Sequence, residues 1–144
     1  MTTVRHVLET KGRNVWSVSP DATVYEALKV MADNNVGALV VLAGDQLKGV
    51  ISERDYARKV ILKGKFSRET PVSEIMSTDV VTVRPEQSIE ECMALMTDKR
   101  IRHLPVLEGE KLVGVISIGD VVKAIISDKE FTIKQLENYI TGSR

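Results

Sequence analysis

The sequence contains an internal repeat, and this feature limits the possible folds more than any other. The 47 residues that begin at Val15 align without a gap with the 47 residues that begin at Val80, an offset of 80 − 15 = 65, with 17 identities. The tetrapeptide Gly-Val-Ile-Ser occurs whole in both repeats and is followed by Asp55 or Asp120. We therefore expect two examples of one supersecondary unit, which can close on each other about a pseudo-twofold axis.

Each repeat has the pattern of a β-α-β-β-α unit, so the expected fold class is α+β (mixed α/β). After an extended stretch comes a helix whose apolar side chains recur at i, i+3, i+4 and i+7, the period of one buried helix face. These side chains are Val24, Ala27, Leu28 and Met31 in the first repeat and Ile89, Cys92, Met93 and Met96 in the second. Two strands joined by a Gly-containing turn follow, and a second helix begins directly after them. The expected strands are 15–18, 37–42 and 47–52 in the first repeat, and 80–83, 101–107 and 112–117 in the second.

The sequence divides the chain into four segments: residues 1–64 (first repeat with its lead-in), 65–79 (linker and second lead-in), 80–128 (second repeat) and 129–144 (tail). The lead-ins correspond to each other as well, Val4, Val7 and Leu8 matching Val72, Ile75 and Met76. In the tail, Ile133, Leu136 and Ile140 share one helix face. We expect a short amphipathic helix there that packs on another surface, such as a partner chain.

Composition excludes several classes of function. Twenty basic residues balance twenty acidic ones, whereas a nucleic-acid or anionic-membrane binder needs an excess of positive charge. The one cysteine rules out an internal disulfide and a cysteine-based metal cluster. No apolar run approaches the ~20 residues of a membrane span, and the N-terminus lacks the apolar region of a signal peptide. We expect a cytoplasmic protein that requires no metal.

The residues available for catalysis are few. The histidines are His6 and His103, and Cys92 lies on the apolar face of a predicted helix, where a buried structural role is expected. The sequence has no nucleophile, base and orienting group in a recognisable arrangement. The sequence therefore predicts a protein that is not an enzyme.

The segment Ser-x-x-Asp, at the start of the second helix of each repeat, has two interpretations. Ser52 or Ser117 can cap the helix while Asp55 or Asp120 at the third helical position completes a capping box. Alternatively, the carboxylate accepts the hydroxyl groups of a ribose while the serine and the backbone N–H groups face a phosphate. Spacing alone leaves the two interpretations open.

The doubled unit, with Pro and an acidic residue at each helix start, a strand Ile-Arg-His-Leu-Pro and a closing Gly-Val-Ile-Ser-x-x-Asp, resembles a pair of cystathionine-beta-synthase (CBS) domains, called a Bateman module. The resemblance covers about residues 4–126. It implies two sites for adenosine-containing ligands between the repeats, with AMP, ADP, ATP, S-adenosylmethionine and NAD as known ligands of the family. It also implies a homodimer, and the chain resembles the stand-alone CBS-pair proteins.

Carried over residue by residue, the resemblance gives Asp55 and Asp120 the role of ribose ligands and Ser52 and Ser117 contacts to phosphate or ribose. The strand that contains Arg102, His103 and Pro105 then lines the adenine and phosphate site, with Thr82 and Val83 beside the base. Ile118 and Gly119 lie between Ser117 and Asp120. In a pseudo-twofold arrangement, Arg54 and Lys59 of the first repeat reach the ligand at Asp120.

The two repeats differ in the charge near these sites. The second has Lys99, Arg100, Arg102 and His103, where the first has Asn34, Asn35, Gly37 and Ala38. Charge-assisted contacts to phosphate favour the Asp120 site over the Asp55 site. The alternatives are a solvated strand edge for the arginines and a core or partner-facing position for His103.

The expected function is a non-catalytic regulatory module that binds AMP, ADP, ATP or NAD and transmits the nucleotide state to an unidentified partner protein. The main alternative is a constitutive dimeric scaffold in which Asp55 and Asp120 act only as helix caps. A third possibility, an enzyme that acts on a bound nucleotide, depends on His103, the one site residue that titrates near neutral pH.

Overall fold

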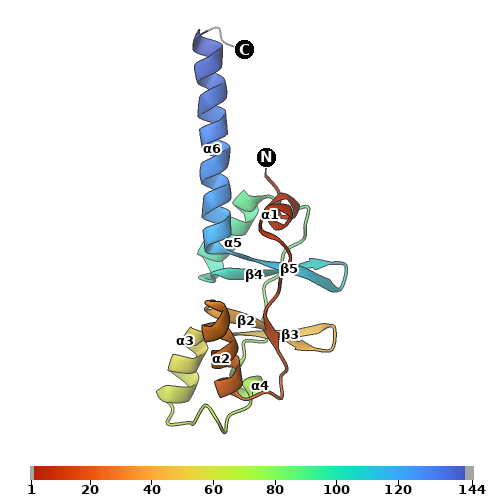
Figure 1. Cartoon of the computed structure of the whole chain (residues 1–144), viewed down its shortest axis with the longest axis vertical. Coiled ribbons are helices and arrows are strands. Elements are labelled where there is room, and N and C mark those ends of the chain that lie inside the picture. The colour runs from red at the N-terminus through yellow and green to blue at the C-terminus, as the bar shows by residue number, and fades with distance from the viewer. Residues whose placement is uncertain (1, 142–144) are drawn as a thin grey trace. The chain divides into compact units, whose positions relative to one another are not determined.

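The structure is a computed structural model that describes residues 2–141, and the chain divides into two compact units (Figure 1). The first-repeat unit comprises Asn14–Val81 and Gly109–Leu112. The second-repeat unit comprises the described parts of residues 1–13, 82–108 and 113–144. The mixed α and β composition predicted for the chain is confirmed in both units.

A three-stranded sheet forms the centre of the first-repeat unit, in the order β1 (Ser17–Val18), β2 (Ala38–Ala43) and β3 (Gln46–Ser52). β1 runs parallel to β2, and β2 and β3 pair antiparallel. Gly44 lies in the turn between β2 and β3 with φ 61°, a left-handed conformation that glycine adopts at little cost.

The helices of the first-repeat unit are α2 (Val24–Asn34), α3 (Glu53–Tyr56), the π-helical turn η1 (Ala57–Ile61) and α4 (Val72–Ile75). The Thr23 side chain caps α2 by accepting a hydrogen bond from the backbone N–H of Glu26 at 3.1 Å. The predicted stripe of α2 is buried with the sheet in one core, which contains Val24, Ala27, Met31, Leu39, Val41, Ile51, Val60, Val72 and Ile75. Leu28 is partly buried against this core.

The second-repeat unit contains α1 (Val4–Lys11), α5 (Ile89–Lys99), β4 (His103–Glu108), α6 (Ile118–Thr141) and all of β5 (Lys111–Ser117) except its first two residues. β4 and β5 form a two-stranded sheet, and Val83 makes a parallel bridge to Val106 at the edge of β4. The core includes Val4, Leu8, Val83, Ile89, Cys92, Met96, Leu104, Val106, Ile116 and Val121. The predicted stripe of α5 is buried except for Met93, which is half-buried.

The lead-ins of the two repeats are exchanged in the structure. The sequence assigned each lead-in to the repeat that follows it, but α1 packs in the second-repeat unit and α4 in the first-repeat unit. The glycine of each Gly-Val-Ile-Ser segment explains this packing. A Cβ added at Gly114 would lie 2.7 Å from a methyl carbon of Leu8, and one added at Gly49 would lie 2.6 Å from the carbonyl oxygen of Ser77. Both glycines therefore make room for the lead-in that packs against them.

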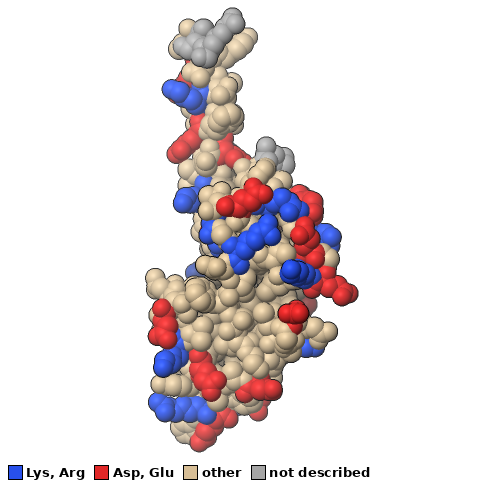
Figure 2. Space-filling model, turned by 45° about the vertical axis from the view of Figure 1, so that its right-hand side comes forward, with Lys and Arg blue, Asp and Glu red and all other residues tan. Residues whose placement is uncertain are grey.

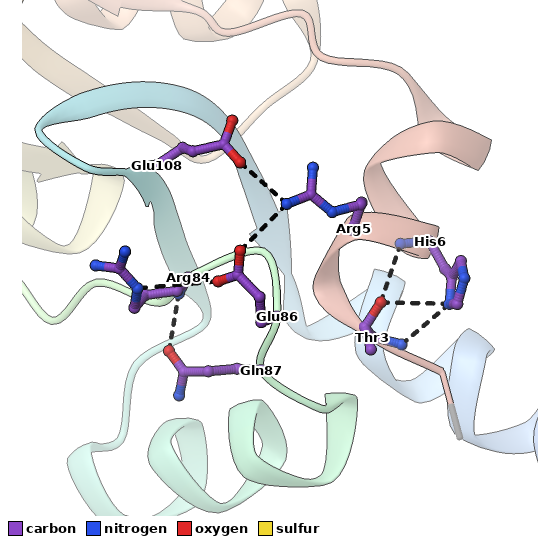
Figure 3. A network of polar contacts seen from close by, with 7 residues as sticks. All are labelled: Thr3, Arg5, His6, Arg84, Glu86, Gln87 and Glu108. Atoms are coloured by element: carbon purple, nitrogen blue, oxygen red, sulfur yellow. Dashed lines mark hydrogen bonds and ion pairs between the residues drawn. The ribbon is translucent and has the colours of Figure 1, made fainter.

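An ion-pair bridge fixes α1 to its unit (Figure 3). The Arg5 guanidinium donates to a carboxylate oxygen of Glu108 at 3.0 Å and to one of Glu86 at 3.2 Å. Thr3 caps the same helix, and the His6 ring accepts from the Thr3 backbone N–H to complete a capping box. His6 thus has a structural position at the start of α1.

Three predicted elements differ from the structure. The second helix of the second repeat and the tail form one continuous helix, α6, because nothing between Asp128 and Phe131 interrupts a helix. The predicted strand 80–83 is reduced to the single bridge at Val83. The helix after β3 changes from α3 to the π-helical turn η1. No helix among residues 2–141 is long and apolar enough to span a membrane.

Candidate functional site

The Ser-x-x-Asp segment of the second-repeat unit forms a capping box at the start of α6. The Ser117 hydroxyl accepts a hydrogen bond from the backbone N–H of Asp120 at 3.2 Å, and Asp120 Oδ2 accepts one from the backbone N–H of Ser117 at 2.8 Å. β5 ends at Ser117 and α6 begins one residue later, so the strand-to-helix junction itself places both side chains. The capping interpretation of this segment is confirmed.

Capping leaves part of the Asp120 carboxylate available. Within the part of the chain that the structure describes, Oδ2 has all of the hydrogen bonds of this carboxylate and Oδ1 has none. The side chain is 23% exposed. A carboxylate accepts through both oxygens, so capping and the binding of a ribose hydroxyl are compatible at this residue.

Lys11 of α1 is the cation beside this carboxylate. Its Nζ donates to Asp120 Oδ2 at 2.6 Å and to the carbonyl oxygen of Val115 at 2.9 Å. Burial raises the pKa of the Asp120 carboxyl, but the hydrogen bonds from Lys11 and Ser117 outweigh it and bring the pKa below its ordinary value. The site therefore combines an ionised carboxylate with an ammonium group.

His103 lies at the start of β4 and is half-buried. Burial is the main cause that lowers the pKa of His103 below its ordinary value of 6.5. The charges of Lys11 and Arg102 lower the pKa further, and the charge of Asp120 raises it in part. The imidazole is therefore neutral at neutral pH and offers one donor and one acceptor to a ligand. The residues whose charges act on it are those of the Asp120 site.

The other predicted residues of this site differ in how accessible they are. Arg102 is exposed, and its carbonyl oxygen accepts from the Ile118 backbone N–H at 2.8 Å, which joins the start of β4 to the start of α6. Gly119 is exposed, and Ile118 and Thr82 are half-buried. Val83 and Pro105 are buried, so they support the strand pair from the core side. The structure thus brings Arg102, His103, Ile118 and Asp120 into one region.

The equivalent segment in the first-repeat unit is also a capping box, but its carboxylate is more fully engaged. Asp55 Oδ2 accepts from the Ser52 backbone N–H at 2.9 Å and from the Ser52 hydroxyl at 3.1 Å. Asp55 Oδ1 pairs with Lys59 Nζ at 3.4 Å, and the side chain is 14% exposed. Both oxygens of Asp55 therefore have partners, in contrast to those of Asp120.

Arg54 and Lys59 lie in the first-repeat unit. Arg54 is exposed on α3, and Lys59 donates to the carbonyl oxygen of Ile75 at 3.0 Å in addition to its ion pair with Asp55. Their predicted contact with a ligand at Asp120 stays a prediction. Within its own unit, Lys59 has a structural role because it ties η1 to α4.

Cys92 is buried on α5, outside the Asp120 site. Burial, together with the nearby Glu91 and Glu90, raises the pKa of the Cys92 thiol to about 11, so the residue stays protonated. Among residues 2–141, no group of three His, Cys, Asp or Glu side chains is arranged to hold a metal ion.

Sequence reasoning missed Lys11. Lys11 lies one turn after Leu8 on α1, on the same side of the helix. Because Leu8 packs against Gly114 of β5, Lys11 also lies beside β5. The sequence does show a basic residue on the apolar side of the first lead-in. That residue points to the Asp120 site only if α1 packs in the second-repeat unit, and the repeat pattern does not predict this packing.

Comparison with known proteins agrees with this architecture. A family model described as CBS domain matches residues 3–62 and 72–127. The chain is 43% identical to the CBS domain-containing protein CBSX3, mitochondrial, of Arabidopsis thaliana, over 98% of this chain and 73% of that protein. It is 36% identical to the CBS domain-containing protein YhcV of Bacillus subtilis, over 95% of this chain and 90% of that one.

A solved structure of a CBS-domain protein from Burkholderia ambifaria matches with a TM-score of 0.85 and 52% sequence identity, over 88% of this chain and 96% of that one. The family match covers both repeats and extends through the lead-ins. The chain therefore belongs to the CBS-domain family and contains a tandem pair of CBS domains.

Proposed function

We propose that this protein binds a phosphorylated adenine nucleotide at the Asp120 site and acts as a non-catalytic regulatory module. The observation that carries the proposal is the state of the Asp120 carboxylate. One oxygen caps α6, and the other has no hydrogen-bond partner among the described residues. A ribose hydroxyl donates to that second oxygen, while Lys11 and Arg102 offer positive charge to the phosphate.

The family supports the choice of ligand class, because CBS domains commonly bind adenosine-containing ligands. AMP, ADP, ATP and NAD all contain the ribose and a 5′-phosphate. The neutral imidazole of His103 donates or accepts one hydrogen bond without adding charge. No metal takes part in the proposed binding.

The Asp55 site is the weaker one in this proposal. A ligand there has to displace Lys59 or the Ser52 hydroxyl from the Asp55 carboxylate. The strand start beside it has Gly37 and Ala38 instead of Arg102 and His103. Occupancy of this site therefore requires a higher ligand concentration.

Regulation requires that the ligand bind one arrangement of the protein more tightly than another. The Burkholderia relative is described as a signal-transduction protein, which fits transmission of the nucleotide state to a partner. The Arabidopsis relative is described as mitochondrial, whereas a cytoplasmic location stays the prediction for this chain.

The test is isothermal calorimetry and thermal unfolding with AMP, ADP, ATP, NAD, adenosine, S-adenosylmethionine and GTP. At a concentration one hundred times its dissociation constant, a ligand stabilises the folded protein by about 2.7 kcal/mol. For a protein of this size, that raises the unfolding temperature by a few degrees. Asp120→Asn keeps an acceptor for the cap but removes the charge, and it should abolish the shift. Asp55→Asn is the matched control, in which most of the shift should remain.

A scaffold whose turns act only as caps is the second candidate, and the two capping boxes support it. It predicts that Asp120→Asn and Asp55→Asn lower the unfolding temperature slightly and that no nucleotide raises it. Nucleotide-free protein that shows no heat of binding with any ligand would decide for the scaffold.

A further inference from the structure

The helix α6 has an exposed apolar stripe with the spacing of a coiled-coil seam. Alternate steps of four and three residues connect six positions: Val122, Ile126, Lys129, Ile133, Leu136 and Ile140. The five apolar side chains are 39–80% exposed. Repeated 4–3 spacing places side chains in one stripe that a second helix can cover over nearly three heptads.

This seam lies on a different side of α6 from the one that packs in the second-repeat unit. Val121 is buried there, and Ile125 and Asp128 are half-buried at the same side. At 100° per residue, the seam is centred about a quarter turn around the helix from Val121. The unit's own packing thus leaves the seam uncovered.

The second half of α6 has little cover of any kind. From Lys129 to Thr141 no residue is buried, and Asn138 alone is half-buried. In Figure 2 uncharged side chains form a strip along this part of α6 beside a few charged ones. A helical segment of this length is marginal in water without tertiary packing, so a covering partner accounts for both its helical form and its apolar stripe.

We propose that the seam of α6 pairs with the seam of a second molecule of this protein in an antiparallel helix pair. Lys129 decides the direction. In a parallel pair in register, two Lys129 side chains would share one layer, which places like charges together in an apolar seam. In the antiparallel pair, Val122 lies opposite Ile140 of the second molecule, and Lys129 lies opposite its Ile133.

The charges that flank the seam fit the same direction. Lys123, Glu130 and Glu137 lie along one edge of the seam at intervals of seven residues. Antiparallel pairing places Lys123 opposite Glu137 of the second molecule, twice per dimer. The two Glu130 side chains meet at the centre, each within one helical turn of the other molecule's Lys129. A parallel pair offers no opposite charge to Lys123 across this edge.

Cross-linking tests the direction of pairing in the full-length protein. Variants Val122→Cys and Ile140→Cys are prepared singly and treated with a short bismaleimide, either alone or as a 1:1 mixture. The native Cys92 is buried, and the unchanged protein controls for it. We expect cross-linked dimers in the mixture only, because identical positions in an antiparallel pair are about 27 Å apart. Cross-linking of each variant alone, or of neither the single variants nor the mixture, overturns the proposal.

Charge reversal provides a second test with its own control. Lys123→Glu and Glu137→Lys should each weaken dimerisation about three- to tenfold in sedimentation experiments, and the double variant should restore it. Within one helix these positions are about 21 Å apart, so only contact between two molecules explains the rescue. If the double variant loses as much dimer affinity as the two single variants together, the antiparallel pair is contradicted. The outcome is independent of nucleotide binding.

Discussion

Lys11 and Lys59 each contact the aspartate of a Ser-x-x-Asp turn, but they come from different elements. Lys59 follows Asp55 by one turn on the same helical segment. The corresponding position in the second repeat is Ala124 (59 + 65), and the cation comes instead from α1. The two turns therefore share their caps and differ in the origin of their positive charge.

This difference makes Lys11→Gln the most informative residue substitution. We expect AMP and ATP to lose about tenfold in affinity, the usual effect of removing one hydrogen bond from a charged group. Adenosine, which has no phosphate, should bind as well as before. Calorimetry with AMP and adenosine measures both effects on one protein preparation.

Lys134→Gln is the matched control, because Lys134 is an exposed lysine about 21 Å along α6 from Asp120. It should leave both affinities unchanged. Equal losses for AMP and adenosine in Lys11→Gln would mean that Lys11 positions Asp120 and does not contact the phosphate.

His103 predicts a pH dependence of stability. Its pKa is lowered in the folded protein, mainly by burial, so protonation favours the unfolded chain. The free energy of unfolding should therefore decrease as pH falls below 6.5, the ordinary pKa of histidine. Asp120 stays ionised in this range because its pKa is lowered below 3.8.

Thermal unfolding at pH 8, 6 and 5 measures this effect in the unchanged protein and in His103→Gln. The variant should lose less stability than the unchanged protein between pH 8 and pH 5. Parallel curves for the two proteins would assign the pH dependence to other groups.

At the level of elements, the glycines of β3 and β5 predict unequal costs for the same substitution. The added Cβ of Gly114→Ala meets the Leu8 side chain, whereas that of Gly49→Ala meets the carbonyl oxygen of Ser77 in the backbone. A side chain can rotate away and a backbone carbonyl cannot. We expect Gly114→Ala to lower the unfolding free energy by about 1–3 kcal/mol and Gly49→Ala to lower it by more.

The double variant Gly114→Ala with Leu8→Ala is the control for this interpretation. Chemical denaturation should show a combined loss smaller than the sum of the single losses, because the smaller side chain at position 8 removes the clash. Strict additivity would mean that α1 does not pack on β5 as the structure shows.

The hydrophobic pattern predicted the helices and strands well because it reports which face of each element is buried. Val24, Ala27 and Met31 are buried as expected. The pattern does not report which element covers that face, and so the exchange of α1 and α4 was not predicted. The tail differs for a related reason: the second repeat was expected to end at residue 128 with a separate helix after it, although the local residues continue one helix, α6.

The candidate site was predicted only in the part that local sequence spacing determines. Ser117 and Asp120 follow from local sequence spacing, since a cap connects residues three apart. Lys11 lies 109 residues from Asp120 along the chain, and only the tertiary packing of Leu8 brings it there. Residues joined by short-range geometry could thus be predicted, and the cation that completes the site could not.

At the scale of the whole molecule, the pairing of α6 predicts how oligomerisation responds to charge. Ile133→Lys places an ammonium group in the seam, where burying a charge without a partner is costly. It should raise the dimer dissociation constant at least about tenfold. Phe131→Lys makes the same chemical change two residues earlier, at a side chain that is 66% exposed and lies off the seam, and it should leave dimerisation unchanged.

Sedimentation equilibrium over a range of concentrations distinguishes these variants, and nucleotide titration of the same samples separates helix pairing from ligand binding. Both variants should bind nucleotide as the unchanged protein does, because residues 131 and 133 lie about 16 Å or more along α6 from Asp120. Equal weakening by the two substitutions would point to general apolar association of α6. A dimer that resists Ile133→Lys would place the interface on other helices and leave the α6 seam for a different partner.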